Sequence, residues 1–158
     1  MTENQTFLLQ RVQPAMVGLI DGSLSTLAPI FSVAVVTHKP HYAFIAGVAT
    51  AIGAGISMAF SEGLSDTGEF TGRGSPMVRG TITGVGTFVG GILHTLPFLI
   101  PHYLVAIWTA VAVVAAELIV LAWARWRFFE VGFIRALASV TLGGVVIAVV
   151  SAALGSAG

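Results

Sequence analysis

The sequence predicts an all-α integral membrane protein with five transmembrane helices, and two observations support this fold class. The chain of 158 residues is 56% hydrophobic and only 9% charged, whereas a soluble domain has roughly 25% charged residues. Apolar stretches of about 20 residues, enough to cross roughly 30 Å of hydrocarbon, recur along the chain. Cysteine is absent, which excludes disulfides and thiolate metal sites. The seven basic and seven acidic residues cancel, so the net charge does not indicate a nucleic-acid partner.

Residues 1–14 are polar and lack an apolar core, so we expect a short arm and not a signal peptide. Residues 15–158 form one transmembrane domain, because no connection between apolar stretches is long enough for a soluble domain. The expected spans are 15–36, 42–63, 79–100, 103–124 and 133–154.

The basic residues predict a cytoplasmic N-terminus and an outside C-terminus. Those on the side of the N-terminus are Arg11, Arg73, Arg79, Arg125, Arg127 and Arg135. Only Lys39 falls on the other side. Cytoplasmic connections carry the excess of positive charge in membrane proteins.

The second span becomes acidic on one face near its end. Met58, Glu62 and Asp66 follow at intervals of four residues, and Glu69 comes three residues later. On a helix these positions share one stripe. A thioether beside carboxylates suits Fe²⁺ or Mn²⁺ better than Ca²⁺ or Mg²⁺. We predict metal ligands here; the alternatives are packing for Met58 and a solvated helix end for Asp66 and Glu69.

Asp21 lies inside the first span, where a carboxylate is costly unless it is paired, hydrated or bound to a cation. Pro29 cannot donate a hydrogen bond to the carbonyl of Ser25, which is one helical turn from Asp21. This predicts an interrupted helix in which Asp21 binds the metal and Ser25 is an accessory group. The alternative is a structural bond from Asp21 to another helix. Adjacent antiparallel spans should bring Asp21 to the depth of Met58.

Two further titratable residues are candidates for proton transfer. Glu117 is a deep carboxylate in the fourth span, and such groups serve as proton relays or counter-ions. A bond to Arg79 or to a hydroxyl is an equally supported structural role. His94 falls near the outer end of the third span, where hydration by water is the simpler expectation.

Rows of small residues predict closely packed helices and support dimerisation. They are Gly47, Ala51 and Gly55 in the second span, and Gly80, Gly84, Gly86 and Gly90 in the third. No nucleotide-binding loop, nucleophile–base pair or zinc-protease spacing is found, so we expect neither enzymatic activity nor a cofactor.

Several segments together carry a family resemblance. They are Ile20–Gly22, Gly53–Ala59 with Glu62, the string Gly55–Asp66 with its continuation to Gly74, and His94–Leu99. Across all five spans they resemble the vacuolar iron transporter family. They look closest to the membrane domain of the bacterial erythrin–vacuolar iron transporter proteins, the membrane-bound ferritins.

The resemblance implies a homodimer in a bacterial inner membrane, with a path at the subunit interface that moves Fe²⁺, or Mn²⁺, out of the cytoplasm in exchange for protons. Asp21, Met58 and Glu62 match the family's pathway residues. The glutamate-rich domain of eukaryotic members has no counterpart between the second and third spans. The ferritin-like partner domain of membrane-bound ferritins is likewise missing from these residues. The alternatives are a membrane module that senses metal or binds a partner, and a dimeric small-ion channel.

Overall fold

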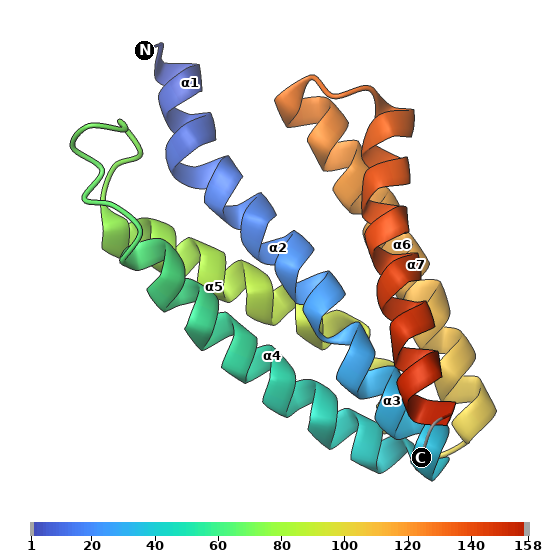
Figure 1. Cartoon of the computed structure of the whole chain (residues 1–158). Coiled ribbons are helices and arrows are strands. Elements are labelled where there is room, and N and C mark those ends of the chain that lie inside the picture. Colours follow the sequence, from blue (N-terminus) through green and yellow to red (C-terminus); the bar gives the residue numbers. More distant parts are fainter. Residues whose placement is uncertain (1, 157–158) are drawn as a thin grey trace.

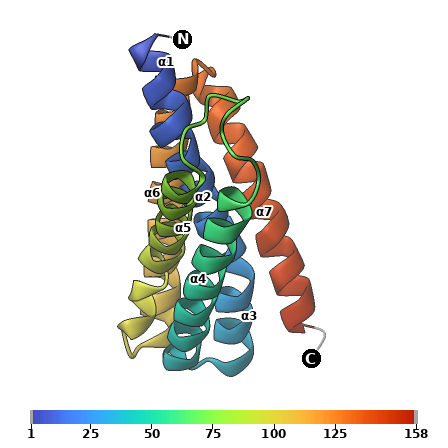
Figure 2. The same cartoon turned by 90° about the vertical axis from the view of Figure 1, so that its left-hand side faces the viewer.

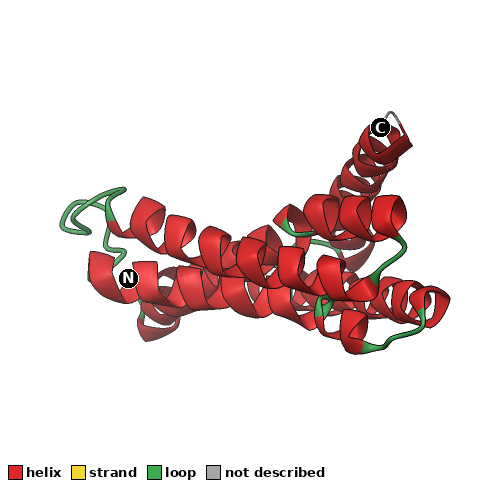
Figure 3. Cartoon of the chain, turned by 90° about the horizontal axis from the view of Figure 1, so that it is seen from below, coloured by secondary structure: helices red, strands yellow, loops and turns green. Residues whose placement is uncertain are grey.

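The computed structural model describes residues 2–156, and within them every regular element is a helix (Figure 3). The first helical run comprises α1 (Glu3–Phe7), the π-helical turn η1 (Leu8–Val12), α2 (Gln13–Ser25) and α3 (Leu27–Thr37). The remaining elements are α4 (Pro40–Gly63), α5 (Pro76–Leu93), the 3-10 turn η2 (Leu96–Leu99), α6 (Tyr103–Phe129) and α7 (Phe133–Ser156).

The long helices run up and down, so the connections alternate between the two ends of the bundle (Figures 1 and 2). The start of α1, the loop between α4 and α5, and the turn between α6 and α7 lie at one end, which we call the N-terminal end. The α3–α4 turn, the α5–α6 connection and the end of α7 lie at the other. The predicted grouping of the arginines on the side of the N-terminus agrees with this arrangement.

Four helical segments are long and apolar enough to cross a membrane. They are Glu3–Thr37, Pro40–Gly63, Tyr103–Phe129 and Phe133–Ser151. Their outward faces carry large apolar side chains such as Phe60 and Trp108, which are more than half exposed. In a membrane these faces contact lipid, so the chain is an integral membrane protein.

Residues 3–14, within the segment expected as a polar arm, are helical, because Thr2 and Gln5 form a capping box that starts α1. One expected boundary is wrong. The span expected at 79–100 ends at Leu93 and gives way to η2. Pro97 explains this difference, since its ring and its missing N–H oppose a continuing helix. At 18 residues, α5 is about 27 Å long.

Helix α5 packs between α2 and α4 at backbone contact, as the glycine rows predict. On the α2 side, a Cβ added to Gly22 would overlap the carbonyl oxygen of Thr87. On the α4 side, a Cβ added to Gly84 would come within 2.6 Å of the carbonyl oxygen of Gly55. Only glycine permits such approaches, and small residues are the usual means of close helix packing in membranes.

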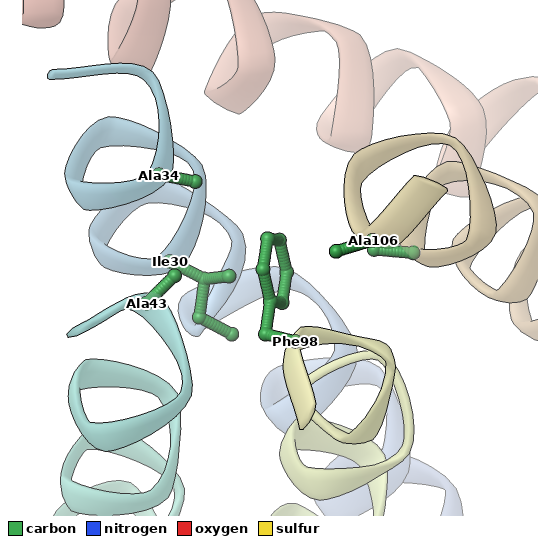
Figure 4. Packing of buried hydrophobic residues seen from close by; sticks show 6 residues of the cluster. Ile30, Ala34, Ala43, Phe98 and Ala106 are labelled. Carbon is green, nitrogen blue, oxygen red and sulfur yellow. The ribbon is translucent and has the colours of Figure 1, made fainter. Parts of the chain in front are cut away.

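A small apolar core closes the other end of the bundle (Figure 4). Ile30 and Ala34 of α3, Ala43 of α4, Phe98 of η2 and Ala106 of α6 are all buried there. Phe98 occupies the space beyond the short α5, and it also borders a cavity between the α3–α4 turn and the α5–α6 connection.

The contact between Gly22 and α5 predicts that two glycine-to-alanine substitutions differ strongly in their effect on stability. Gly22→Ala should destabilise the fold by about 3 kcal/mol or more, because α2 and α5 must separate to admit the methyl group. Gly53→Ala is the matched control, since an added Cβ there meets no atom within 4 Å. Unfolding in detergent measures both free energies. Equal stability of the two variants would contradict the contact.

Candidate functional site

Four charged side chains meet at the N-terminal end of the bundle. Arg79 Nε donates to Glu62 Oε1 at 2.9 Å, and Arg79 Nη2 lies 3.3 Å from Asp66 Oδ1. Arg73 contacts the same two carboxylates, through Nη2 to Glu62 Oε1 and through Nη1 to Asp66 Oδ2 at 3.1 Å. We call these residues the arginine cluster. Two cations therefore neutralise two carboxylates around the C-terminal end of α4.

Arg79 is fully buried although it is charged. Besides its ion pairs, its guanidinium donates to the carbonyl oxygens of Gly74 at 3.1 Å and Asp66 at 3.3 Å. A buried charge needs both a counter-ion and satisfied hydrogen bonds. Arg79 obtains both by holding the loop that follows α4 against α5.

The loop itself is shaped by glycine. Gly68, Gly72 and Gly74 all have positive φ angles, of 81°, 67° and 72°, a conformation that other residues adopt at a cost. Gln10 of η1 donates from Nε2 to the carbonyl oxygen of Gly72 at 3.0 Å. The first helical run, the loop and α5 are thereby connected at this end.

The pKa of Asp66 is held below its ordinary value of 3.8. Desolvation acts in the opposite direction and raises it. Hydrogen bonds from the Gly68 N–H and the Thr71 hydroxyl, the charge of Arg79 and a hydrogen bond from Arg73 together outweigh that effect.

The structure brings together only part of the predicted metal site. Glu62 and Asp66 are adjacent, but both are engaged by arginines, and Glu69 lies exposed on the loop. Among residues 2–156, no group of three or more histidine or acidic side chains is placed to hold a metal ion. Reasoning from the sequence missed the arginine partners; Arg73 in the loop and Arg79 just inside α5 were the available signals.

Asp21 and Met58 lie at similar depth, with α5 as the common reference. Gly22, next to Asp21, faces Thr87, and the residue that follows Met58 faces Gly84. Thr87 and Gly84 are three residues apart on α5, which corresponds to about 4.5 Å. The depth expected from the sequence therefore agrees with the packing to about one helical turn.

Asp21 is half-exposed on α2 and makes no hydrogen bond or ion pair that the structure records with another described residue. Val17, one turn before it, and Ser25, one turn after it, are exposed. Together these three residues form an outward-facing strip on α2, which we call the Asp21 strip. Met58 on α4 is also half-exposed.

The predicted interruption of the first helix occurs at Thr26, between α2 and α3. Its hydroxyl donates to the carbonyl oxygen of Gly22 at 2.8 Å. This is the position next to Ser25, whose carbonyl Pro29 was expected to leave free.

Thr26 also begins a buried polar chain in the middle of the bundle. Its Oγ1 lies 2.7 Å from Nε2 of His94, and Nδ1 of the same ring lies 3.0 Å from Oε2 of Glu117. Thr26 and His94 are fully buried, and Glu117 is 9% exposed.

This chain corrects two expectations from the sequence. His94 is not hydrated at the outer end of a span, because α5 stops early and leaves the ring inside the bundle. Glu117 does not bond Arg79, which is committed to the arginine cluster. That the two candidates pair with each other was not foreseen, since they were placed at different depths.

No protein-family model, no curated protein and no solved structure matches this chain.

Because Arg79 is buried, we expect its substitution to lower the stability of the fold much more than substitution of Arg73. Arg79→Gln should lower the free energy of unfolding by about 3 kcal/mol or more, because Glu62 and Asp66 would share Arg73 as their one remaining cation and the loop would lose the buried guanidinium that donates to its carbonyl oxygens. Arg73→Gln should cost about 1 kcal/mol or less, since the Arg73 side chain is 21% exposed and water screens it. Denaturant titration in micelles compares them. A larger loss from Arg73→Gln would contradict the assignment.

The lowered pKa of Asp66 predicts the direction of a pH effect. The folded protein binds this proton less readily than the unfolded chain, so the stabilisation is complete above the unfolded value of 3.8 and is lost as pH falls through the folded value. Asp66→Asn should be less stable than wild type at neutral pH, and the two should converge in acid. Thermal unfolding across the acid range tests this; a gap that widens in acid would contradict it.

Proposed function

We propose that the protein transports a divalent transition metal, Fe²⁺ or Mn²⁺, out of the cytoplasm in exchange for protons, as a homodimer. The observation that carries this proposal is Asp21. A carboxylate within a membrane span costs about 3 kcal/mol or more, and Asp21 has no recorded partner among the described residues to offset this. A passing cation would supply the missing charge.

Met58 supports a transition metal over a hard cation. Its thioether lies within about one helical turn of the depth of Asp21, on a helix packed against the same α5. Sulfur is a soft ligand, which Fe²⁺ accepts and which Mg²⁺ and Ca²⁺ do not favour.

A second copy of the chain would complete the site. One copy offers a single free carboxylate and one sulfur at this depth, which is too few ligands for a divalent ion. The Asp21 strip is outward-facing, so a two-fold axis beside α2 would bring the strips of two copies together. Such a dimer doubles the ligands to two carboxylates and two thioethers.

In this proposal α5 is a fifth span, and the N-terminal end faces the cytoplasm. Its 18 residues cover about 27 Å, and glycine and threonine occupy the faces that it packs against α2 and α4. The arginines at the N-terminal end favour a cytoplasmic location. A bacterial inner membrane is the location that fits this orientation and the family resemblance.

The arginine cluster gives the acidic stripe a second role. Glu69, exposed on the loop, remains available to gather metal from the cytoplasm. Glu62 and Asp66, paired with Arg73 and Arg79, would keep the cytoplasmic entrance of the path closed until a metal ion competes for their carboxylate oxygens. The path then leads to Asp21 and Met58, with Ser25 as an accessory oxygen.

The proposal is tested by Fe²⁺ entry into proteoliposomes under oxygen-free conditions, with and without a pH gradient. Asp21→Asn keeps the size of the side chain but removes its charge, so we expect Fe²⁺ flux to fall to background while the protein remains folded. Glu3→Gln, an exposed acidic residue on α1, is the matched control and should transport normally.

Three outcomes would count against the proposal. Wild-type flux from Asp21→Asn would remove Asp21 from the path. Fe²⁺ flux at the same rate with and without a pH gradient would indicate a small-ion channel. No flux from the folded wild-type protein would favour a sensing or partner-binding module.

A further inference from the structure

His94 and Glu117 form an isolated titratable pair at the centre of the bundle. The ring lies just after α5, and the carboxyl group projects from the middle of α6. The transport path proposed above does not use either residue as a metal ligand. Their placement therefore needs its own explanation.

The hydrogen bonds determine which atom of His94 donates. The Thr26 hydroxyl has one proton, and it donates this proton to the carbonyl oxygen of Gly22 at 2.8 Å. Thr26 Oγ1 can then only accept at its 2.7 Å contact with His94 Nε2. Nε2 must therefore carry a hydrogen.

The same reasoning places one proton between His94 and Glu117. Nδ1 and Oε2 lie 3.0 Å apart, a hydrogen-bond distance that requires a proton on one of the two atoms. If the proton is on Oε2, both residues are neutral. If it is on Nδ1, an imidazolium faces a carboxylate. The pair holds one exchangeable proton in either case and carries no net charge.

Loss of that proton is incompatible with the observed contact. Nδ1 and Oε2 would then face each other as two acceptors, and the contact would become repulsive. Glu117 Oε1 is buried and has no hydrogen-bond partner among the described residues. A purely structural carboxyl group usually has both oxygens satisfied. Glu117 is instead held by His94 alone, so it can part from the ring when the proton leaves.

No other charged group adjoins the pair on the elements packed around it. On α2 the titratable residue is Asp21, five residues before Thr26 in the chain. On α5 and α4 the charged residues are Arg79 and Glu62, both in the arginine cluster at the N-terminal end. The charged residues of α6 and α7, Arg125, Arg127 and Arg135, lie near the α6–α7 turn, and η2 has none.

We infer that His94 and Glu117 form the site that binds and releases the proton exchanged for metal. This deepens the transport function proposed above and rests on it. The hydrogen-bonded chain runs from Glu117 through His94 and Thr26 to the carbonyl of Gly22, in the residue next to Asp21. Proton release would disturb this chain at the interruption of the first helix, so it is linked to the metal site without touching the metal.

Glu117→Gln is the decisive variant. The glutamine amide can donate to Nδ1 and keep the contact, but it has no proton to release. Glu130→Gln, at the exposed end of α6, is the matched control. Two assays are run on the full chain in proteoliposomes: exchange of isotopically labelled Fe²⁺ at equal concentration on both sides, and net Fe²⁺ movement driven by a pH gradient.

Labelled exchange needs no net proton movement, so Glu117→Gln should retain it and lose gradient-driven transport. Glu130→Gln should retain both. Gradient-driven transport at the wild-type level in Glu117→Gln would overturn the inference, and so would loss of labelled exchange from the folded variant. If Glu117→Gln does not fold, His94→Gln enters the same assays with the same expectations.

Infrared titration separates this inference from the transport proposal. A carboxyl band that changes with pH in wild type and is absent from Glu117→Gln supports an exchangeable proton at the pair, even if no metal is transported. Identical titrations of the two proteins would overturn the inference while leaving metal transport untouched.

Discussion

The backbone of α5 contacts the backbones of α2 and α4 at glycine residues, and the other features depend on this close packing. Because Gly22 and Gly84 allow backbones to touch, α5 fixes the relative depth of the helices on its two sides. Asp21 and Met58 thereby reach similar depth. The two ends of the same helix place Arg79 in the arginine cluster and His94 inside the bundle. One short helix thus positions Asp21, Met58, Arg79 and His94.

Burial explains why the polar groups differ so much in their surroundings. Arg79 and His94 are fully buried, and each has charged or hydrogen-bonding partners, as the cost of desolvation requires. Asp21 differs because it is half-exposed and no described residue engages it. Inside a membrane span, an acidic group without a partner is most simply explained by a cation that binds there reversibly.

Local patterns in the sequence predicted much of this structure. Apolar stretches indicated the membrane helices, the glycine spacing indicated the two packed faces of α5, and Pro29 indicated the break that occurs at Thr26. The pairings were harder to predict, because they depend on where a helix stops. Assigning α5 a full-length span placed His94 away from Glu117, although Pro97 signalled the earlier end. The partners of Arg79, Glu62 and Asp66 in place of the expected Glu117, could not be predicted, since nothing local reveals which carboxylates a loop will bring to an arginine.

The central claim is that the Asp21 strips of two copies face each other across a two-fold axis. Because the chain has no cysteine, single cysteines can be introduced at Val17, one turn from Asp21, and at Ile119 on α6, both of which are exposed. Residues near a two-fold axis meet their own copies. Oxidation in native membranes should therefore cross-link the Val17→Cys protein into a covalent dimer and leave the Ile119→Cys protein monomeric. Cross-linking through Ile119→Cys without Val17→Cys would contradict the claim.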